Sequence, residues 1–321
     1  KMASTLTEFI IKCGSIYYDG NPTKNNKAKF NSIGCHYGTL EGFKNASVQD
    51  FNNLSTIEGK KCFSPLTFKE QQALTQLQED CDTRITLEQN FIKILTKDFI
   101  QRQVKAIESI TLEGLNANPL LCRALKLNTP EEFIKFYAYS ALSRSIVTSM
   151  GFLVQDLMLY SNTNVYDGKN YPESYGTKWD VVIEGLDGIR SYREVESGPN
   201  DLDKTQILAY DKAIKKVLDG NEKAFIGITY GKSDGKYVST SILEKYVDNW
   251  KSKVLIGKDL WDYISDNSSY HETLMSTIQR TAEAVLCNES LIDKIDEKIN
   301  SLLNDFVSHF SNMDNFYSTL W

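Results

Sequence analysis

The sequence has few of the residues that mark several common protein classes. It contains only three histidines and six cysteines in 321 residues, without a CxxC pair or a zinc-like Cys/His spacing. It has no apolar run of transmembrane length and no GxxxxGK[ST] phosphate loop. These absences argue against a zinc enzyme, a histidine-based nuclease, a membrane protein and an ATP-driven translocase.

Length and charge set broad limits on what remains. A 321-residue chain with 41% hydrophobic content can bury a core, which predicts one large domain or two unequal ones. The net charge of −6 argues against a protein that coats nucleic acid by bulk charge, but it is compatible with a local basic cleft.

The chain start and the cysteines predict a cytoplasmic protein. The polar residues after Lys1, Met2 and Ala3 do not resemble a signal peptide, and we expect Met2 to be the natural start. Scattered cysteines in such a protein are expected to be reduced thiols of the core: Cys13, Cys35, Cys62, Cys81, Cys122 and Cys287.

Helical patterns dominate both ends of the chain. Apolar residues at helix-like spacing between residues 64 and 99 predict a broken pair of helices. Thr129 as a cap, Pro130 at the first position and two acids behind it predict a helix that runs to about residue 159, with a break near Gly151. Further helices are predicted at residues 270–287 and 290–310.

The middle of the chain predicts a sheet. Residues 179–184 and 189–196 alternate around a Gly-rich turn, as in a β-hairpin. A helix to about residue 218 and an apolar strand at 224–230 follow, so a right-handed crossover is expected. With another short strand at 254–257, the predicted class is α/β (α+β): a mixed central sheet flanked by helices, with a helix-rich N-terminal part.

Three acids of this hairpin are candidates for chemistry. Glu194 and Glu196 are two residues apart on one strand and therefore share a face, and Asp180 begins the preceding strand. Such an oxygen-rich edge suits Mg²⁺, which can hold a phosphate and activate water. Acids on hairpins usually face solvent. The Ser-Gly-Pro-Asn turn directly after Glu196, leading into a lysine-bearing helix, favours the functional interpretation.

This segment resembles the PD-(D/E)XK nuclease superfamily, especially type II restriction endonucleases in which a (D/E)-x-K-S-G-P-N strand precedes a helix. Residues 225–235 and 255–264 look like the third core strand and a later strand-to-helix segment of enzymes that cut interrupted palindromes of the RGGNCCY kind. The helix with Ser143 and Gln155 is similar to the first core helix of that family, although many relatives carry an acid in place of Gln155. The resemblance covers residues 115–290.

The resemblance implies a function and a domain organisation. It implies a bacterial, Mg²⁺-dependent endonuclease of a restriction system that hydrolyses double-stranded DNA as a homodimer. Asp180 and Glu194 would bind the metal, and Glu196 would be catalytic and an additional metal ligand. We expect a helix-rich dimerisation region at residues 1–114, a catalytic domain at 115–290 and a C-terminal helix at 291–321. This helix could pack with the N-terminal region and contribute to the dimer surface.

Glu196 departs from the pattern of the family. That pattern has lysine at this position, where it orients the attacking water and stabilises charge on the phosphate. Some restriction enzymes carry Glu or Gln there, so Glu196 is either natural and orients water, or the result of an inactivating Lys→Glu change. The sequence alone leaves both hypotheses open.

Basic and polar residues near the acids are candidates for DNA contacts. Asn200, Lys204, Lys232 and Ser233 lie near the ends of the acid-bearing strands and are expected to contact phosphates. The resemblance assigns base recognition to the loop with Lys169, Tyr175 and Lys178, although this loop could also be a mere surface connection. Two other functions stay open: a DNA-binding protein that does not cut, and a structure-selective repair or resolvase nuclease.

Overall fold

The computed structural model describes residues 5–54, 56–57, 60–61, 63–171, 175, 178–310 and 312–319. Lys1, Met2 and Cys62, for which we made predictions, lie outside these residues. The chain divides into two compact units, unit 1 with Lys1–Leu95 and Val154–Ile278, and unit 2 with Thr96–Leu153 and Gln279–Trp321. The domain boundaries predicted at residues 114 and 290 stay a prediction.

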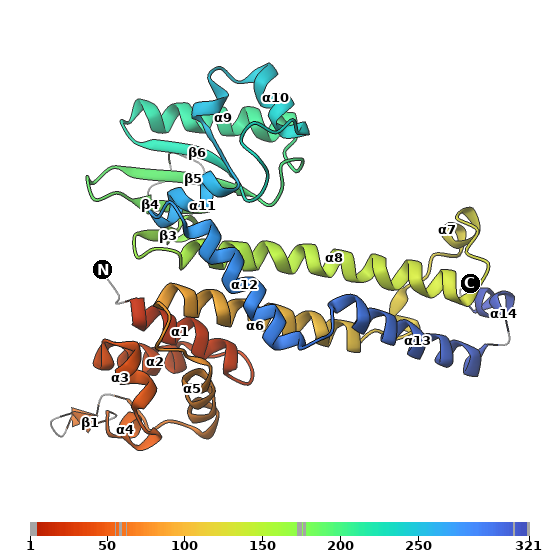
Figure 1. Cartoon of the computed structure of the whole chain (residues 1–321), viewed down its shortest axis with the longest axis horizontal. Helices are drawn as coiled ribbons and strands as arrows, with labels where there is room; N and C mark the ends of the chain where they lie inside the picture. The colour runs from red at the N-terminus through yellow and green to blue at the C-terminus, as the bar shows by residue number, and fades with distance from the viewer. Residues whose placement is uncertain are drawn as a thin grey trace. The chain divides into compact units, whose positions relative to one another are not determined.

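Unit 1 begins with a module of short helices (Figure 1). Capping boxes at Thr23, Ser47 and Thr67 satisfy the free N–H groups where three of the helices start. An ion pair of 2.8 Å between Lys29 Nζ and Glu70 Oε2 is buried inside the module. Its elements are α1 (Thr5–Tyr17), α2 (Lys24–Tyr37), α3 (Leu40–Asn45), α4 (Val48–Asn53), β1 (Thr56–Ile57), β2 (Lys60–Lys61) and α5 (Phe68–Asp80).

The second part of unit 1 is a five-stranded mixed sheet of order β3-β4-β5-β6-β7. The β3–β4 and β4–β5 pairs are antiparallel, and the β5–β6 and β6–β7 pairs are parallel. The predicted hairpin is thus present, whereas β3 was missed because its residues were predicted as loop. The strands are β3 (Val165–Asp167), β4 (Val181–Glu184), β5 (Arg190–Glu196), β6 (Lys223–Ile228) and β7 (Val254–Ile256).

Helices cover both faces of this sheet, as predicted (Figure 1). The helices α9 (Lys204–Asp219) and α10 (Val238–Tyr246) bury Ile207, Ile214 and Leu243 in a core with sheet residues. On the other face, α11 (Lys258–Ser265) places Leu260 beside Gly227, where an added Cβ would lie 2.9 Å from it. Burial of this kind contributes about 1.5–3 kcal/mol for each large apolar side chain. The sheet is therefore a rigid platform for residues at its edge.

Unit 2 is helical. Its core contains Phe133, Ile299, Leu302, Phe306 and Phe316, all buried. The helices that lie in it wholly or in part are α6 (Leu87–Glu108), η1 (Glu113–Leu115), α7 (Pro119–Ala124), α8 (Pro130–Leu159), α12 (Tyr270–Leu286), α13 (Leu291–His309) and α14 (Met313–Ser318).

Helix α8 corrects one prediction. It runs without interruption past Gly151, where we predicted a break. A single glycine costs a helix interior only about 0.5–1 kcal/mol relative to alanine, and the apolar residues on both sides favour continuation.

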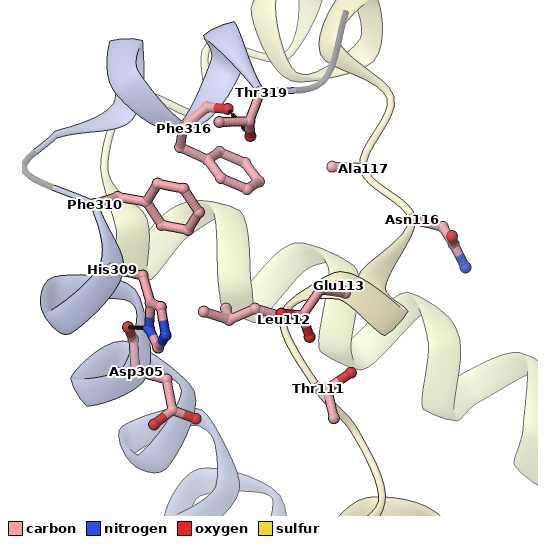
Figure 2. Close-up of a pocket in the computed structure, with 10 residues that line it drawn as sticks. All are labelled: Thr111, Leu112, Glu113, Asn116, Ala117, Asp305, His309, Phe310, Phe316 and Thr319. Atoms are coloured by element: carbon pink, nitrogen blue, oxygen red, sulfur yellow. Dashed lines mark hydrogen bonds between the residues drawn. The ribbon is translucent and has the colours of Figure 1, made fainter.

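A cavity of about 750 Å³ opens in unit 2 (Figure 2). Its apolar side chains come from Leu112, Ala117, Phe310 and Phe316. Glu113 and Asp305 are carboxylates among its lining residues, and the His309 ring lies near the main chain of Asp305, with Nδ1 2.7 Å from its carbonyl oxygen.

Two sequence-based expectations concern the chain as a whole. No helix in the described part of the chain is long and apolar enough to cross a membrane. No disulfide joins the five cysteines that the structure describes. Cys13, Cys81 and Cys122 are buried, as predicted for core thiols, but Cys35 and Cys287 are exposed.

Candidate active site

The β4–β5 hairpin brings the three predicted acids to one edge of the sheet. Val181 pairs with Arg193, so the antiparallel register places the preceding residue, Asp180, opposite Glu194. Residues opposite each other in an antiparallel pair share a face. Glu196 follows two residues later on the same face as Glu194, at the end of β5. The sequence-based prediction that these residues share a face agrees with this register.

The main chain holds Asp180 from three directions. Its backbone N–H donates to Arg193 O at 2.9 Å, and its carbonyl accepts from Gly168 N at 3.0 Å. Its carboxylate Oδ2 accepts from the backbone N–H of Val195 at 3.0 Å. Because Val195 lies between Glu194 and Glu196, this bond directs the Asp180 carboxylate towards both glutamates.

Glu194 is the most perturbed acid of the group. Its side chain is buried, and this burial raises its pKa to about 8, with further increases from the Asp180 and Glu196 charges and a hydrogen bond with Asp180. The nearby Lys169 cation acts in the opposite direction. At neutral pH the metal-free site therefore keeps a proton, because carboxylates this close together resist full ionisation.

Glu196 has a different partner. The hydroxyl of Tyr210, on α9, donates to Glu196 Oε1 at 3.2 Å. Burial raises the pKa of Glu196, the Tyr210 bond opposes this, and the charges of Asp180 and Asp201 add to the increase. The backbone carbonyl of Glu196 accepts from Thr229 N at 3.1 Å, so the end of β5 is also fixed to the segment after β6.

These acids are suitable ligands for a divalent ion, though not as a complete cage. Among the described residues, no three His, Cys, Asp or Glu side chains converge closely enough to hold a metal by themselves. Asp180 and Glu194 share a hydrogen bond while Glu194 holds its proton, and their charges repel when both are ionised. A bound cation would relieve that repulsion. Mg²⁺ is usually bound by one or two carboxylates, with waters and substrate phosphates as its other ligands. The pair fits that type of site.

Arg193 directly precedes Glu194 on β5, and its side chain lies on the opposite face of the strand. Its guanidinium is fully buried between the rings of Phe225 and Tyr263, 4.1 and 4.5 Å from their centroids. Burial lowers the pKa of this guanidinium to about 10. The stack ties β5 to β6 and α11 directly behind the acids.

Of the predicted base-reading residues, Lys169 lies close enough to the acids for its charge to influence Glu194. It is exposed in the short helix after β3. Tyr175 is half-buried, and its hydroxyl donates to Glu222 Oε2 at 2.7 Å. The hydroxyl is therefore engaged in a hydrogen bond within the protein. Lys178 is exposed two residues before Asp180.

The predicted phosphate-contacting residues are exposed near the same edge. Asn200 accepts from Val238 N at 3.0 Å and so caps the start of α10, which gives it a structural role as well. The Lys204 ammonium lies 4.1 Å from the centre of the Tyr246 ring. Lys232 and Ser233 follow β6 in an exposed loop.

Tyr210 is the site residue that sequence analysis missed. It lies three residues after Ile207 and four before Ile214, both of which are buried against the sheet. Residues at these spacings share a helix face, so the periodicity of α9 could have placed Tyr210 towards the acids.

A mixed sheet flanked by helices, with acids on a hairpin before a crossover helix, defines a restriction-endonuclease-like fold. The family model of the type II restriction endonuclease EcoO109I matches residues 87–285, and this range contains Asp180, Glu194, Glu196 and Tyr210. The match covers more than half of the chain, so the protein belongs to this family of deoxyribonucleases, which act on DNA in restriction systems and typically use a divalent metal. No individual curated protein is similar enough to count as a match.

Proposed function

We propose that this protein is a type II restriction endonuclease of the PD-(D/E)XK type. It hydrolyses double-stranded DNA with Mg²⁺ at a short, interrupted palindrome, for which the RGGNCCY kind is the first to test. The bond of the Asp180 carboxylate to Val195 N is the observation that supports this most, because it turns Asp180 towards both glutamates of β5.

The proposed roles follow from where each acid lies. Bound Mg²⁺ would hold the scissile phosphate and lower the pKa of an attacking water. Asp180 and Glu194 are the proposed ligands, and Glu194 would have to lose its proton to act as one. Glu196, at the open end of β5, accepts a proton from the water. A P–O bond to the water forms and the P–O3′ bond breaks, leaving a 5′-phosphate and, after protonation of the leaving oxygen, a 3′-hydroxyl.

Positive charge near the acids supports DNA as the substrate. Lys169, Lys178, Lys204 and Lys232 are all exposed around this edge of the sheet, and Asn200 and Ser233 are exposed among them. Basic side chains that contact phosphates supply most of the affinity for DNA, and this contribution falls as salt rises. We propose that these residues and Tyr175 form the DNA-contacting surface.

A homodimer would place one site on each strand of a two-fold symmetric sequence. Unit 2 offers a surface for it, because exposed apolar patches often mark protein interfaces. Val147 and Phe152 on α8 are 66% and 67% exposed, and Ile292 and Val307 on α13 are 52% and 73% exposed. We propose that unit 2, which contains the C-terminal helix and residues 96–114, forms the dimer surface.

The experiment is Mg²⁺-dependent cleavage of plasmid and phage DNA at low salt. The present chain and Glu196→Lys are tested side by side, with Asp180→Asn as the inactive control. Discrete fragments from the present chain or from Glu196→Lys support a site-specific endonuclease. Cleavage confined to branched DNA would favour a structure-selective nuclease instead.

The same experiment decides the role of Glu196. If the present chain cuts and Glu196→Lys does not, Glu196 is part of the working site. If only Glu196→Lys cuts, the glutamate is an inactivating replacement. If neither cuts but both bind DNA in a salt-dependent way, the protein is a DNA binder that has lost cleavage.

A further inference from the structure

Tyr210 contacts the acid at the end of β5. Its half-buried hydroxyl lies 3.2 Å from Glu196 Oε1. A phenol hydroxyl is protonated at neutral pH, so Tyr210 is the donor of this bond and Glu196 Oε1 is the acceptor. The side chain therefore places a neutral donor in a group of acids.

The position of Tyr210 is set by the packing of α9. Asp203 and Gln206 form a capping box that fixes the start of the helix, and Ile207 is fully buried one turn before Tyr210. Asp211, the next residue, is buried and pairs with Lys253 Nζ at 2.6 Å, which ties α9 to the residue before β7. The hydroxyl thus has little freedom to move away from Glu196.

The bond counters a repulsion. The Glu196 carboxylate lies near the negative charges of Asp180 and Asp201, and the Tyr210 hydroxyl is a donor that acts against them. A hydroxyl that donates to one oxygen of a carboxylate restricts its rotation and leaves the other oxygen free. The donor therefore decides which oxygen of Glu196 faces outward.

We propose that Tyr210 is a positioning residue for hydrolysis, whose hydroxyl holds Glu196 Oε1 so that Glu196 Oε2 faces the attacking water. The proposal rests on the proposed function for the reaction itself. The proton of the water passes to Oε2 as the P–O bond forms and the P–O3′ bond breaks. Tyr210 touches neither the substrate nor the water.

The test is a double-mutant cycle with Tyr210→Phe and Glu196→Gln, read as single-turnover cleavage in Mg²⁺. Tyr210→Phe should lower the cleavage rate about tenfold or more, because a misplaced general base loses part of its catalytic contribution. The KM for DNA should stay unchanged. On the Glu196→Gln background the same change should cost less than about threefold, because it acts through Glu196. Tyr139→Phe is the matched control, since it removes a tyrosine–carboxylate bond to Asp296, also 3.2 Å long, within unit 2.

Three results would overturn the proposal: a Tyr210→Phe enzyme that cuts at the normal rate, one that loses only DNA affinity, or an equal loss on both backgrounds. If the present chain cuts no DNA, the cycle cannot be read as cleavage, and the proposed function is judged separately from the result of Glu196→Lys. The same cycle is then measured as shifts in the denaturant midpoint of unfolding. If the shifts of Tyr210→Phe and Glu196→Gln add up in the double variant, Tyr210 does not hold Glu196. If they do not add up, it does.

Discussion

The Asp180 carboxylate accepts a hydrogen bond, 3.0 Å long, from the backbone N–H of the residue between Glu194 and Glu196. A backbone donor is present whatever side chain other than proline position 195 carries. The geometry therefore depends on the carboxylate of Asp180 and on the hairpin register, and it tolerates exchange of Val195 for other strand-forming residues. This dependence leads to the first prediction.

Asp180→Asn should lower cleavage by at least about a hundredfold, because the variant loses the charge of a proposed metal ligand and the barrier rises by about 1.4 kcal/mol for each tenfold loss. Its fold should remain, since an amide oxygen can still accept from Val195 N. Mg²⁺-dependent cleavage and circular dichroism measure the two effects. Glu244→Gln, at an exposed acid on α10, is the control and should cut normally. Full activity of Asp180→Asn would remove this residue from the site.

The second prediction concerns pH in the metal-free protein. The pKa of Glu194 is raised from 4.5 to about 8, so between these values the folded state holds a proton that the unfolded state has lost. Stability should then fall as pH rises through this window, by at most about 1.4 kcal/mol per pH unit for one proton. Glu194→Gln should lack this part of the slope. Urea unfolding in EDTA from pH 5 to 8 measures it, and parallel curves for both proteins would contradict the shift.

The third prediction concerns the buried ion pair of the N-terminal module. Burial disfavours ionised Glu70, but bonds from Lys29, Asn26 and Thr67 outweigh it and lower its pKa. The resulting stability is present above the ordinary pKa and is lost as pH falls through the lowered one. Glu70→Gln leaves the Lys29 ammonium buried without a counter-charge and should cost about 3–5 kcal/mol. Urea unfolding at pH 7 checks this, and the double variant Lys29→Met with Glu70→Met should lose much less.

The fourth prediction tests the support of Asp180. An added Cβ on Gly168 would lie 2.2 Å from the carbonyl oxygen of Trp179, so Gly168→Ala must displace the chain next to Asp180. We expect a loss of cleavage of about a hundredfold, as small displacements of reacting groups produce. Gly151→Ala is the matched control, because nothing lies within 4 Å of its added Cβ. The control should cut normally and gain about 0.5–1 kcal/mol of stability from its helical position.

The fifth prediction tests the proposed dimer surface. Val147→Lys with Phe152→Lys places two charges at exposed apolar positions of α8 and should give a monomer in light scattering. The monomer should cut both strands of its site poorly. Phe68→Lys changes an apolar residue that is 71% exposed on α5 and should stay dimeric. A monomer from Phe68→Lys alone would move the interface to the N-terminal module.

Much of the sheet could be predicted because its signals are local. The β4–β5 hairpin follows from alternation around a Gly-rich turn, and the shared face of Asp180, Glu194 and Glu196 follows from the register of that hairpin. The strand β3 carries no comparable signal: it has three residues and lies in a segment rich in Asn and Tyr. Such a short strand forms only because β4 offers it a partner.

The parts of the site that were not predicted depend on long-range contacts. The Tyr175 hydroxyl points to Glu222, a residue far along the chain, so its direction could not be predicted from the local sequence. The Tyr210–Glu196 bond needs α9 to fold back onto the strand that precedes it. Periodicity indicates which face of α9 is buried, but only the packed structure shows which atom that face meets.

The layout of the sheet also orders the steps by which the protein assembles. Asp180, Glu194 and Glu196 belong to one hairpin, and hairpins form within about 1–10 μs. The parallel partner β6 becomes available only after α9, and non-local parallel pairing is slower. Synthesis proceeds from the N-terminus, so a nascent chain that ends before β6 contains all three acids but lacks the Thr229 bond that fixes the end of β5. The edge of the sheet that carries the three acids is therefore completed late, when β6 pairs with β5.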